Sequence, residues 1–294
     1  MTVPIWGVGK GENRGYSGDH SSHLTNGKEG KVMGLSRRTV LGVVAGSGLV
    51  GLTMGASSVQ AAQSGELSLM PAGAKTLEEL QQQLAGIPRR RDFKEVPMIL
   101  TQRDQWDAEA LDAVLHYQGK HKQVWDQAIL DGPWLNLMRN SLNCQIWAFH
   151  HPDFLAVSAT HGMAHLALYD AHIWEKYQIA KLTGGKYQEN HFLKIPEAAH
   201  ADAKAFQDEN GVFSPADNSI PVLQARGVVF LACHNSIFEV CHRLHGEGVN
   251  PDKLTVPQMV AELTNHLIPG VILTPGIAGT LSEMGGFGFQ YVHP

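Results

Sequence analysis

The chain has 294 residues, of which 43% are hydrophobic and 17% are charged, and its formal net charge at pH 7 is −5. This composition excludes a collagen-like, low-complexity or mostly disordered chain. No stretch has the dense lysine and arginine that bind nucleic-acid phosphates, so we expect no nucleic-acid partner.

An export signal is predicted near the amino terminus. Arg37 and Arg38 precede an apolar, glycine-rich run over residues 42–55, and small residues follow up to Ala62. These are the positive, apolar and cleavage-site parts of a secretory signal. The paired arginines resemble the twin-arginine (Tat) signal, which implies passage through the Tat translocase to the periplasm. The alternative is a membrane anchor, but the run is too short and glycine-rich, so we expect no stable membrane span after cleavage.

Three segments are predicted along the chain. Residues 1–61 form an N-terminal extension with the signal peptide, residues 62–121 a polar lead-in with a helix, and residues 122–294 an α/β domain with an insertion at 183–219. Residues 1–61 hold six Lys/Arg and three Asp/Glu, which leaves 17 basic against 25 acidic residues in the rest. The Tat resemblance implies export in the folded state, which favours a bound metal or cofactor.

The fold class is predicted from apolar periodicity. Helical spacing covers residues 77–84 and starts again at Asp104. From residue 122, short apolar strands alternate with amphipathic helices. Strands are predicted at 122–129, 154–159, 228–232, 271–273 and 287–292, and helices at 134–147, 162–179, 220–226, 235–245, 256–266 and 278–284. This alternation predicts a three-layer α/β sandwich with a central, mostly parallel sheet of about five strands.

Polar residues follow three of the predicted strands. The three strand ends are Thr160 to Gly162, Cys233 to Asn235, and Thr274 to Gly276. Ligands of open α/β sheets bind beyond the carboxyl ends of the strands, so neighbouring strands would bring these ends to one crevice. The predicted ligand-binding residues are His234, Asn235, Thr160, Thr274 and Gly276.

Cys233 is the first candidate catalytic residue. It lies where a strand passes into a helix, and the N–H groups at a helix start favour a thiolate. His161, at the end of another strand, is the second candidate. The alternative for Cys233 is a small buried core residue. The other cysteines, Cys144 and Cys241, are predicted to lie in the core, and the odd total leaves at least one thiol unpaired or shared between chains.

A metal site is the main alternative at the same place. His161 and His165 are four residues apart on a predicted helix, a spacing that can direct two imidazoles at one ion. Cys233 and His234 complete the candidate ligand set, and zinc or copper suits imidazole. The simpler interpretation is that His165 only packs in the core.

Two segments resemble the DsrE/DsrF-like superfamily of small α/β proteins. They are ARGVVFLACHNSIFEVCHRL (225–244) and PGVILTPGIAGTL (269–281). In that family such a strand ends in a cysteine, which corresponds here to Cys233. The resemblance implies a DsrE-like fold, a cysteine that accepts persulfide sulfur, and a homo-oligomer. The export signal, the insertion at 183–219 and the lead-in helix at 104–118 lie outside the family pattern.

Three hypotheses follow for function. The first is a periplasmic sulfur-handling protein that uses Cys233, with small sulfur species or another small molecule as its partner. The second is a metal-binding protein or metalloenzyme with Cys and His ligands. The third is a non-catalytic interaction domain, since a fold does not fix a function. Whether the protein is an enzyme is left open.

Overall fold

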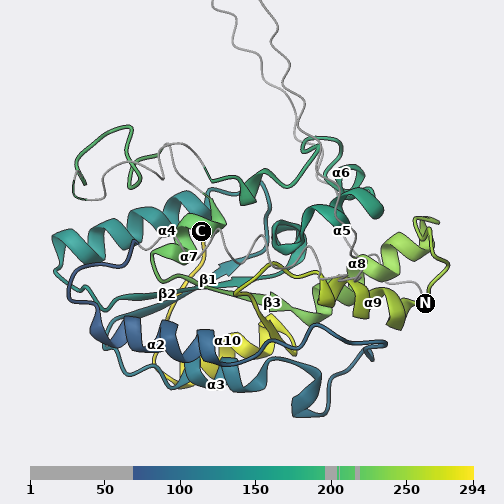
Figure 1. Cartoon of the computed structure of the whole chain (residues 1–294), viewed down its shortest axis with the longest axis horizontal. Coiled ribbons are helices and arrows are strands. Elements are labelled where there is room, and N and C mark those ends of the chain that lie inside the picture. The colour runs from purple at the N-terminus through teal and green to yellow at the C-terminus, as the bar shows by residue number, and fades with distance from the viewer. Residues whose placement is uncertain (1–68, 196–203, 205, 216–218) are drawn as a thin grey trace, which may run out of the picture. The chain divides into compact units, whose positions relative to one another are not determined.

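The computed structural model describes residues 69–195, 204, 206–215 and 219–294, so the predicted extension and signal at 1–61 lie outside the described residues. Its centre is a five-stranded sheet in the order β4-β3-β2-β1-β5, and every pairing is parallel. The strands are β1 (Lys122–Gln127), β2 (Leu155–Thr160), β3 (Val229–Cys233), β4 (Ile272–Thr274) and β5 (Gln290–Val292). The predicted three-layer α/β sandwich is confirmed (Figure 1).

One face of the sheet, which presents Trp125 and Phe230, packs against most of the helices. These are α4 (Trp134–Asn143), α5 (Ala171–Lys176), α6 (Ile179–Leu182), α7 (Ile220–Ala225), α8 (His234–Gly246) and α9 (Val256–Asn265). Their apolar residues recur at helical spacing, as in α4, where Leu135, Met138 and Leu142 are buried. Each helix therefore has an apolar side to bury against the strands.

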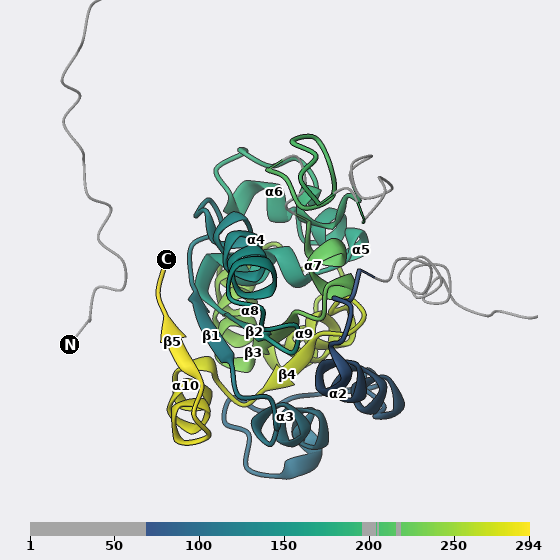
Figure 2. The same ribbon diagram turned by 90° about the vertical axis from the view of Figure 1, so that its left-hand side faces the viewer.

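The opposite face packs against α2 (Lys75–Gly86), α3 (Ala108–Leu115) and α10 (Ile277–Gly286). Figure 2 shows these three helices together on the side of the sheet away from α4. Residues of the predicted lead-in thus form much of one layer. A partly buried ion pair helps to fix them: Arg91 Nη2 lies 2.9 Å from Asp107 Oδ2, which also accepts a hydrogen bond from the N–H of Leu273 in β4.

The order of the strands reverses at one point. From β1 to β4 the chain steps across the sheet in one direction, with its connecting helices on the α4 face. It then returns through α10 on the other face, and β5 pairs with β1. The reversal between β1 and β5 is the place where open α/β sheets form a crevice at the carboxyl ends of their strands.

The prediction of one continuous helix over 162–179 is wrong, because the structure divides this segment into shorter helices. Residues Gly162–Leu168 make a 3-10 helix, η3, and the chain is extended at Tyr169 before α5 begins. Tyr169 forms an isolated antiparallel bridge with Leu267, and this tertiary pairing interrupts the helical pattern. Asp170 then caps α5, because its Oδ1 accepts a hydrogen bond from Ile173 N at 3.0 Å.

A second difference concerns the helix predicted at 134–147. α4 ends at Asn143 and continues as a π-helical turn, η2 (Cys144–Ala148). Cys144 is exposed and not in the core as predicted, because it follows buried Leu142 by two residues and so lies on the opposite side of the helix. The described residues also form two short 3-10 helices, η1 (Arg103–Gln105) and η4 (His191–Leu193). Within the described residues, no helix combines the length and the apolarity needed to cross a bilayer.

Candidate functional site

The carboxyl edge of the sheet brings Cys233 and His161 together. Thr160 pairs with Ala232, and Cys233 pairs with Thr274. His161 keeps an extended backbone (φ −146°, ψ −170°), so it continues β2 beside Cys233. Adjacent strands lie about 4.8 Å apart and paired residues point to the same face. The two predicted catalytic residues therefore share the α10 side of one sheet edge.

An aspartate on β1 holds the imidazole of His161. Asp126 Oδ1 lies 2.6 Å from His161 Nε2, and Asp126 Oδ2 accepts a hydrogen bond from the Tyr291 hydroxyl at 2.6 Å. His293 Nδ1 lies 3.9 Å from the same Oδ2. With Nε2–H donating to Asp126, Nδ1 is the nitrogen left to exchange a proton. The group lies on β1, β2 and β5, next to the reversal of strand order.

The turn after His161 fixes where its ring can lie. Gly162 has φ +52°, and a Cβ there would come within 2.9 Å of the Ala128 carbonyl oxygen, so a side chain is excluded. Two backbone N–H groups hold the same turn: His161 N donates to the Gln127 carbonyl oxygen at 2.9 Å, and Gly162 N donates to the Ser236 hydroxyl oxygen at 2.9 Å. The imidazole therefore projects from a rigid strand end.

Cys233 lies at the start of two helices. It is the residue before α8, and its Sγ accepts a hydrogen bond of 3.4 Å from the N–H of Ile277, the first residue of α10. Both helix ends place partial positive charge near the sulfur, which stabilises a thiolate. Cys233 is nevertheless only 5% exposed and packs with Leu231 and Ile272.

The cluster has the groups needed for thiol chemistry. Cys233 supplies a nucleophilic sulfur, His161 supplies a base, and Asp126 sets the tautomer of that base. Among the hydrogen bonds of the described residues, none joins Sγ to His161. Catalytic contacts are often long or poorly aligned in ligand-free sites and tighten when the substrate binds.

Of the five predicted ligand-binding residues, three lie near Cys233 and two point elsewhere. Thr274 and Gly276 flank the sulfur, and the Asn235 side chain is so near Gly276 that a Cβ there would come within 2.9 Å of its Nδ2. Thr160 faces the opposite side of the sheet, where its hydroxyl forms a hydrogen bond of 2.8 Å with the hydroxyl of Ser158. His234 is fully buried, with Nε2 at 3.1 Å from the Met98 carbonyl oxygen.

The predicted metal set of His161, His165, Cys233 and His234 does not appear as a cluster. Among the described residues, the group of three whose ligand atoms lie within 4.8 Å of one another is His172, Glu262 and His266. His165 follows a 3-10 turn, in which residues four apart point in different directions. It is fully buried, and burial lowers its pKa to about 3, with His161 adding to the effect.

Sequence reasoning missed Asp126 and Tyr291. Asp126 follows the apolar pair Val124 and Trp125 near the carboxyl end of β1, and a carboxylate at the end of a strand is a signal that was available. Tyr291 gave no such signal, because tyrosine is common in strands. Only the pairing of β5 with β1 brings it to Asp126.

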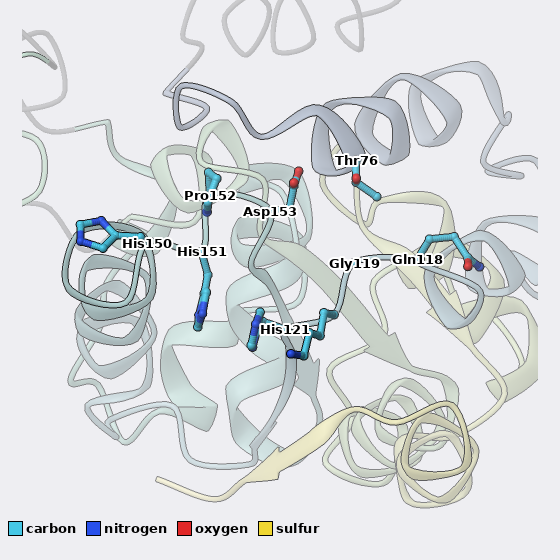
Figure 3. Close-up of a pocket in the computed structure, with 9 residues that line it drawn as sticks. Thr76, Gln118, Gly119, His121, His150, His151, Pro152 and Asp153 are labelled. Atoms are coloured by element: carbon cyan, nitrogen blue, oxygen red, sulfur yellow. The ribbon is translucent and has the colours of Figure 1, made fainter.

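A hollow of about 310 Å³ lies at the other end of the sheet, before β1 and β2. Figure 3 shows His121 and His151 side by side in it, with the ring of His150 apart from them. The two rings are stacked with their centroids 3.5 Å apart. Partial removal from water lowers the pKa of His121, as does the adjacent His151. Cysteine is absent from its lining, so we do not place the thiol chemistry here.

Comparison with protein-family models, curated proteins and solved structures gives no match to this chain. The resemblance to the DsrE/DsrF-like superfamily stays a prediction.

Proposed function

We propose that the protein handles sulfur through Cys233, as an acceptor and carrier of sulfane sulfur. The observation that carries the proposal is the placement of Cys233 Sγ. It accepts the N–H of Ile277 and lies in register beside His161, which is held by Asp126. The DsrE-like segments point to the same residue and the same chemistry.

The proposed step is the transfer of one sulfur atom from a persulfide or polysulfide donor. His161 takes the proton of Cys233, and the thiolate attacks the outer sulfur of the donor. The bond between the two donor sulfurs breaks as the new S–S bond forms on Cys233. The electron pair leaves with the donor thiolate, which takes up the proton, so the step needs no added oxidant or reductant.

Burial of Cys233 fits a small substrate better than a large one. Ala278 and Gly279, in the first turn of α10, are exposed, and nothing lies within 4 Å of a Cβ built on Gly279. A small inorganic sulfur species needs little space there, and the first-turn N–H groups of α10 suit its negative charge. We therefore propose inorganic polysulfide as the probe.

The test is intact-mass spectrometry of the chain from residue 62 after incubation with polysulfide. We expect the mass of one added sulfur atom, lost on treatment with a reducing thiol. Cys233→Ser should abolish the adduct. Cys144→Ser is the matched control and should retain it, because Cys144 is exposed but lies on η2, away from the cluster.

The third cysteine sharpens the same experiment. Cys241 is fully buried, and burial raises the pKa of its thiol, so it should stay unmodified. An adduct that persists in Cys233→Ser and disappears in Cys144→Ser would overturn the proposal.

The proposal includes export to the periplasm by the Tat translocase, supported by Arg37 and Arg38 and the apolar run that follows. In a Tat-competent bacterial host, Arg37→Lys with Arg38→Lys should leave the full-length chain in the cytoplasm. Release of the double variant into the periplasm would contradict this route. The homo-oligomer implied by the resemblance also stays a prediction.

A further inference from the structure

A second cluster of titratable side chains lies on the other face of the sheet. His172 is in α5, Glu262 is in α9, and His266 directly follows α9. Their candidate ligand atoms all lie within 4.8 Å of one another, and His172 Nε2 is 3.8 Å from Glu262 Oε1. The two imidazole rings are stacked with their centroids 4.7 Å apart. None of these residues takes part in the sulfur chemistry proposed above.

A backbone clamp holds the elements that carry the cluster. Tyr169 and Leu267 form an antiparallel bridge, with hydrogen bonds from Asp170 N to His266 O at 3.2 Å and from Ile268 N to Leu168 O at 3.0 Å. The start of α5 and the end of α9 are therefore tied together. Rigid elements of this kind keep ligand atoms in place before an ion arrives.

Each of the inner ligands is oriented by another side chain. His266 Nδ1 lies 2.7 Å from Asp170 Oδ2, which leaves Nε2 for an ion. Glu262 Oε2 accepts a hydrogen bond of 2.7 Å from the Tyr177 hydroxyl, so an ion would bind Oε1, which Lys176 contacts in its absence. A carboxylate behind a histidine and a donor behind a carboxylate are the outer contacts that metal ligands characteristically have.

We propose that His172, Glu262 and His266 bind a divalent transition-metal ion, for which Zn²⁺ is the best fit. Two imidazoles and one carboxylate, with a fourth position open to water, form a known type of zinc site. Tetrahedral zinc needs ligand atoms about 3.4 Å apart. The exposed side chain of His172 can supply the small inward movement that this requires.

In the absence of a metal ion, Lys176 neutralises the carboxylate of Glu262. Its Nζ contacts Glu262 Oε1 and lies 2.6 Å from Asp252 Oδ2. A metal ion at Oε1 would repel the ammonium toward Asp252, which already binds it. Lys176 therefore opposes metal binding, and we expect its removal to tighten binding.

The test is titration of the untagged, chelator-treated chain with Zn²⁺ in competition with a chromogenic chelator, and with Co²⁺ in an absorption spectrometer. We expect one Zn²⁺ per chain and the intense visible bands of tetrahedral Co²⁺. His172→Ala should weaken binding at least about 10-fold and remove the bands. His242→Ala, which removes an exposed histidine of α8, is the matched control and should change neither.

A second variant tests the position of the ion. Lys176→Met should bind Zn²⁺ more tightly than the unaltered chain by a few-fold. Unchanged or weaker binding would contradict an ion at Glu262 Oε1. If His172→Ala bound Zn²⁺ as tightly as the unaltered chain, the assignment of the site would be wrong. Binding of less than one Zn²⁺ per chain would show that the binding is adventitious.

Discussion

Two histidine–aspartate pairs in this molecule have nearly the same length and different neighbours. His161 Nε2 lies 2.6 Å from Asp126 at the carboxyl edge of the sheet, and His266 Nδ1 lies 2.7 Å from Asp170 between α5 and α9. The first pair has a thiol beside it in the strand register. The second has a carboxylate and another imidazole.

The difference shows that a carboxylate behind a histidine does not by itself define a function. In both pairs it sets the tautomer and the orientation of the ring. The third group decides the rest: a thiol can give its proton to the imidazole, whereas Glu262 and His172 can share a metal ion with it. The two assignments therefore predict effects that separate cleanly.

The largest expected effect is that of Asp126→Ala on sulfur uptake. Without the carboxylate, His161 loses its tautomer and orientation, so we expect uptake by Cys233 to slow about 100-fold, the lower end for general acid–base catalysis. The rate of adduct formation measures this. Zn²⁺ affinity should not change, and Asp126→Asn provides a variant of the same shape. An unchanged rate in both variants would remove His161 from the mechanism.

A third imidazole, His165, sharpens the comparison because it is buried without a carboxylate. Its pKa in the folded chain is about 3, against 6.5 when exposed, so below pH 6.5 the unfolded chain binds a proton that the folded chain does not. Stability should therefore fall as the pH falls, by about 3 kcal/mol between pH 6.5 and pH 4. Urea unfolding of the unaltered chain and of His165→Leu measures this contribution, which the variant should lack. Parallel pH profiles would show that His165 titrates normally.

Asp170→Ala is expected to have the next largest effect. Loss of an outer carboxylate typically weakens metal binding by about 10–100-fold. Competition titration with Zn²⁺ measures the change, and the polysulfide adduct on Cys233 should form at its usual rate. If Asp170→Ala slowed sulfur uptake and left Zn²⁺ binding intact, the two pairs would have been assigned the wrong way round.

The smallest effect is predicted for Tyr291→Phe. Its hydroxyl donates to Asp126, but the residue is 56% exposed, so the lost hydrogen bond should cost at most about 1 kcal/mol in urea unfolding. The hydrogen bond to Asp126 raises the pKa of Tyr291, and Asp126→Ala should lower that pKa in a spectrophotometric titration. A Tyr291 pKa that does not respond would place the hydroxyl away from the carboxylate in solution.

Much of the fold could be predicted because its strands are buried on both faces. Runs such as FLAVSA and VVFLA have no alternation of polar and apolar residues, which is typical of parallel strands covered by helices. The positions of β2, β3 and β4 were predicted to within a residue or two on this basis. Cys233 and His161 could be predicted as neighbours at one sheet edge because both lie at the ends of such strands.

The rest depends on contacts between distant segments. The break at Tyr169 results from pairing with Leu267, about a hundred residues away in the chain, and the periodicity of residues 162–179 contains no trace of it. The His172, Glu262 and His266 cluster depends on the same pairing. The spacing of His161 and His165 would direct both imidazoles to one side only in an α-helix. The chain forms a 3-10 turn there, so the two rings point in different directions.

One face of the sheet is covered jointly by α2 and α3, near the start of the described chain, and by α10, near its end. During synthesis, α10 and β5 leave the ribosome after β1, β2, β3 and β4. Until then β1 lacks its β5 partner, and the aliphatic side chains of the growing sheet are only partly covered, a state that invites aggregation or chaperone binding. The proposed site around Cys233 and His161 also waits for these elements, since Ile277 and Tyr291 contribute to it. The proposed thiol chemistry therefore depends on two elements that are synthesised after the other four strands.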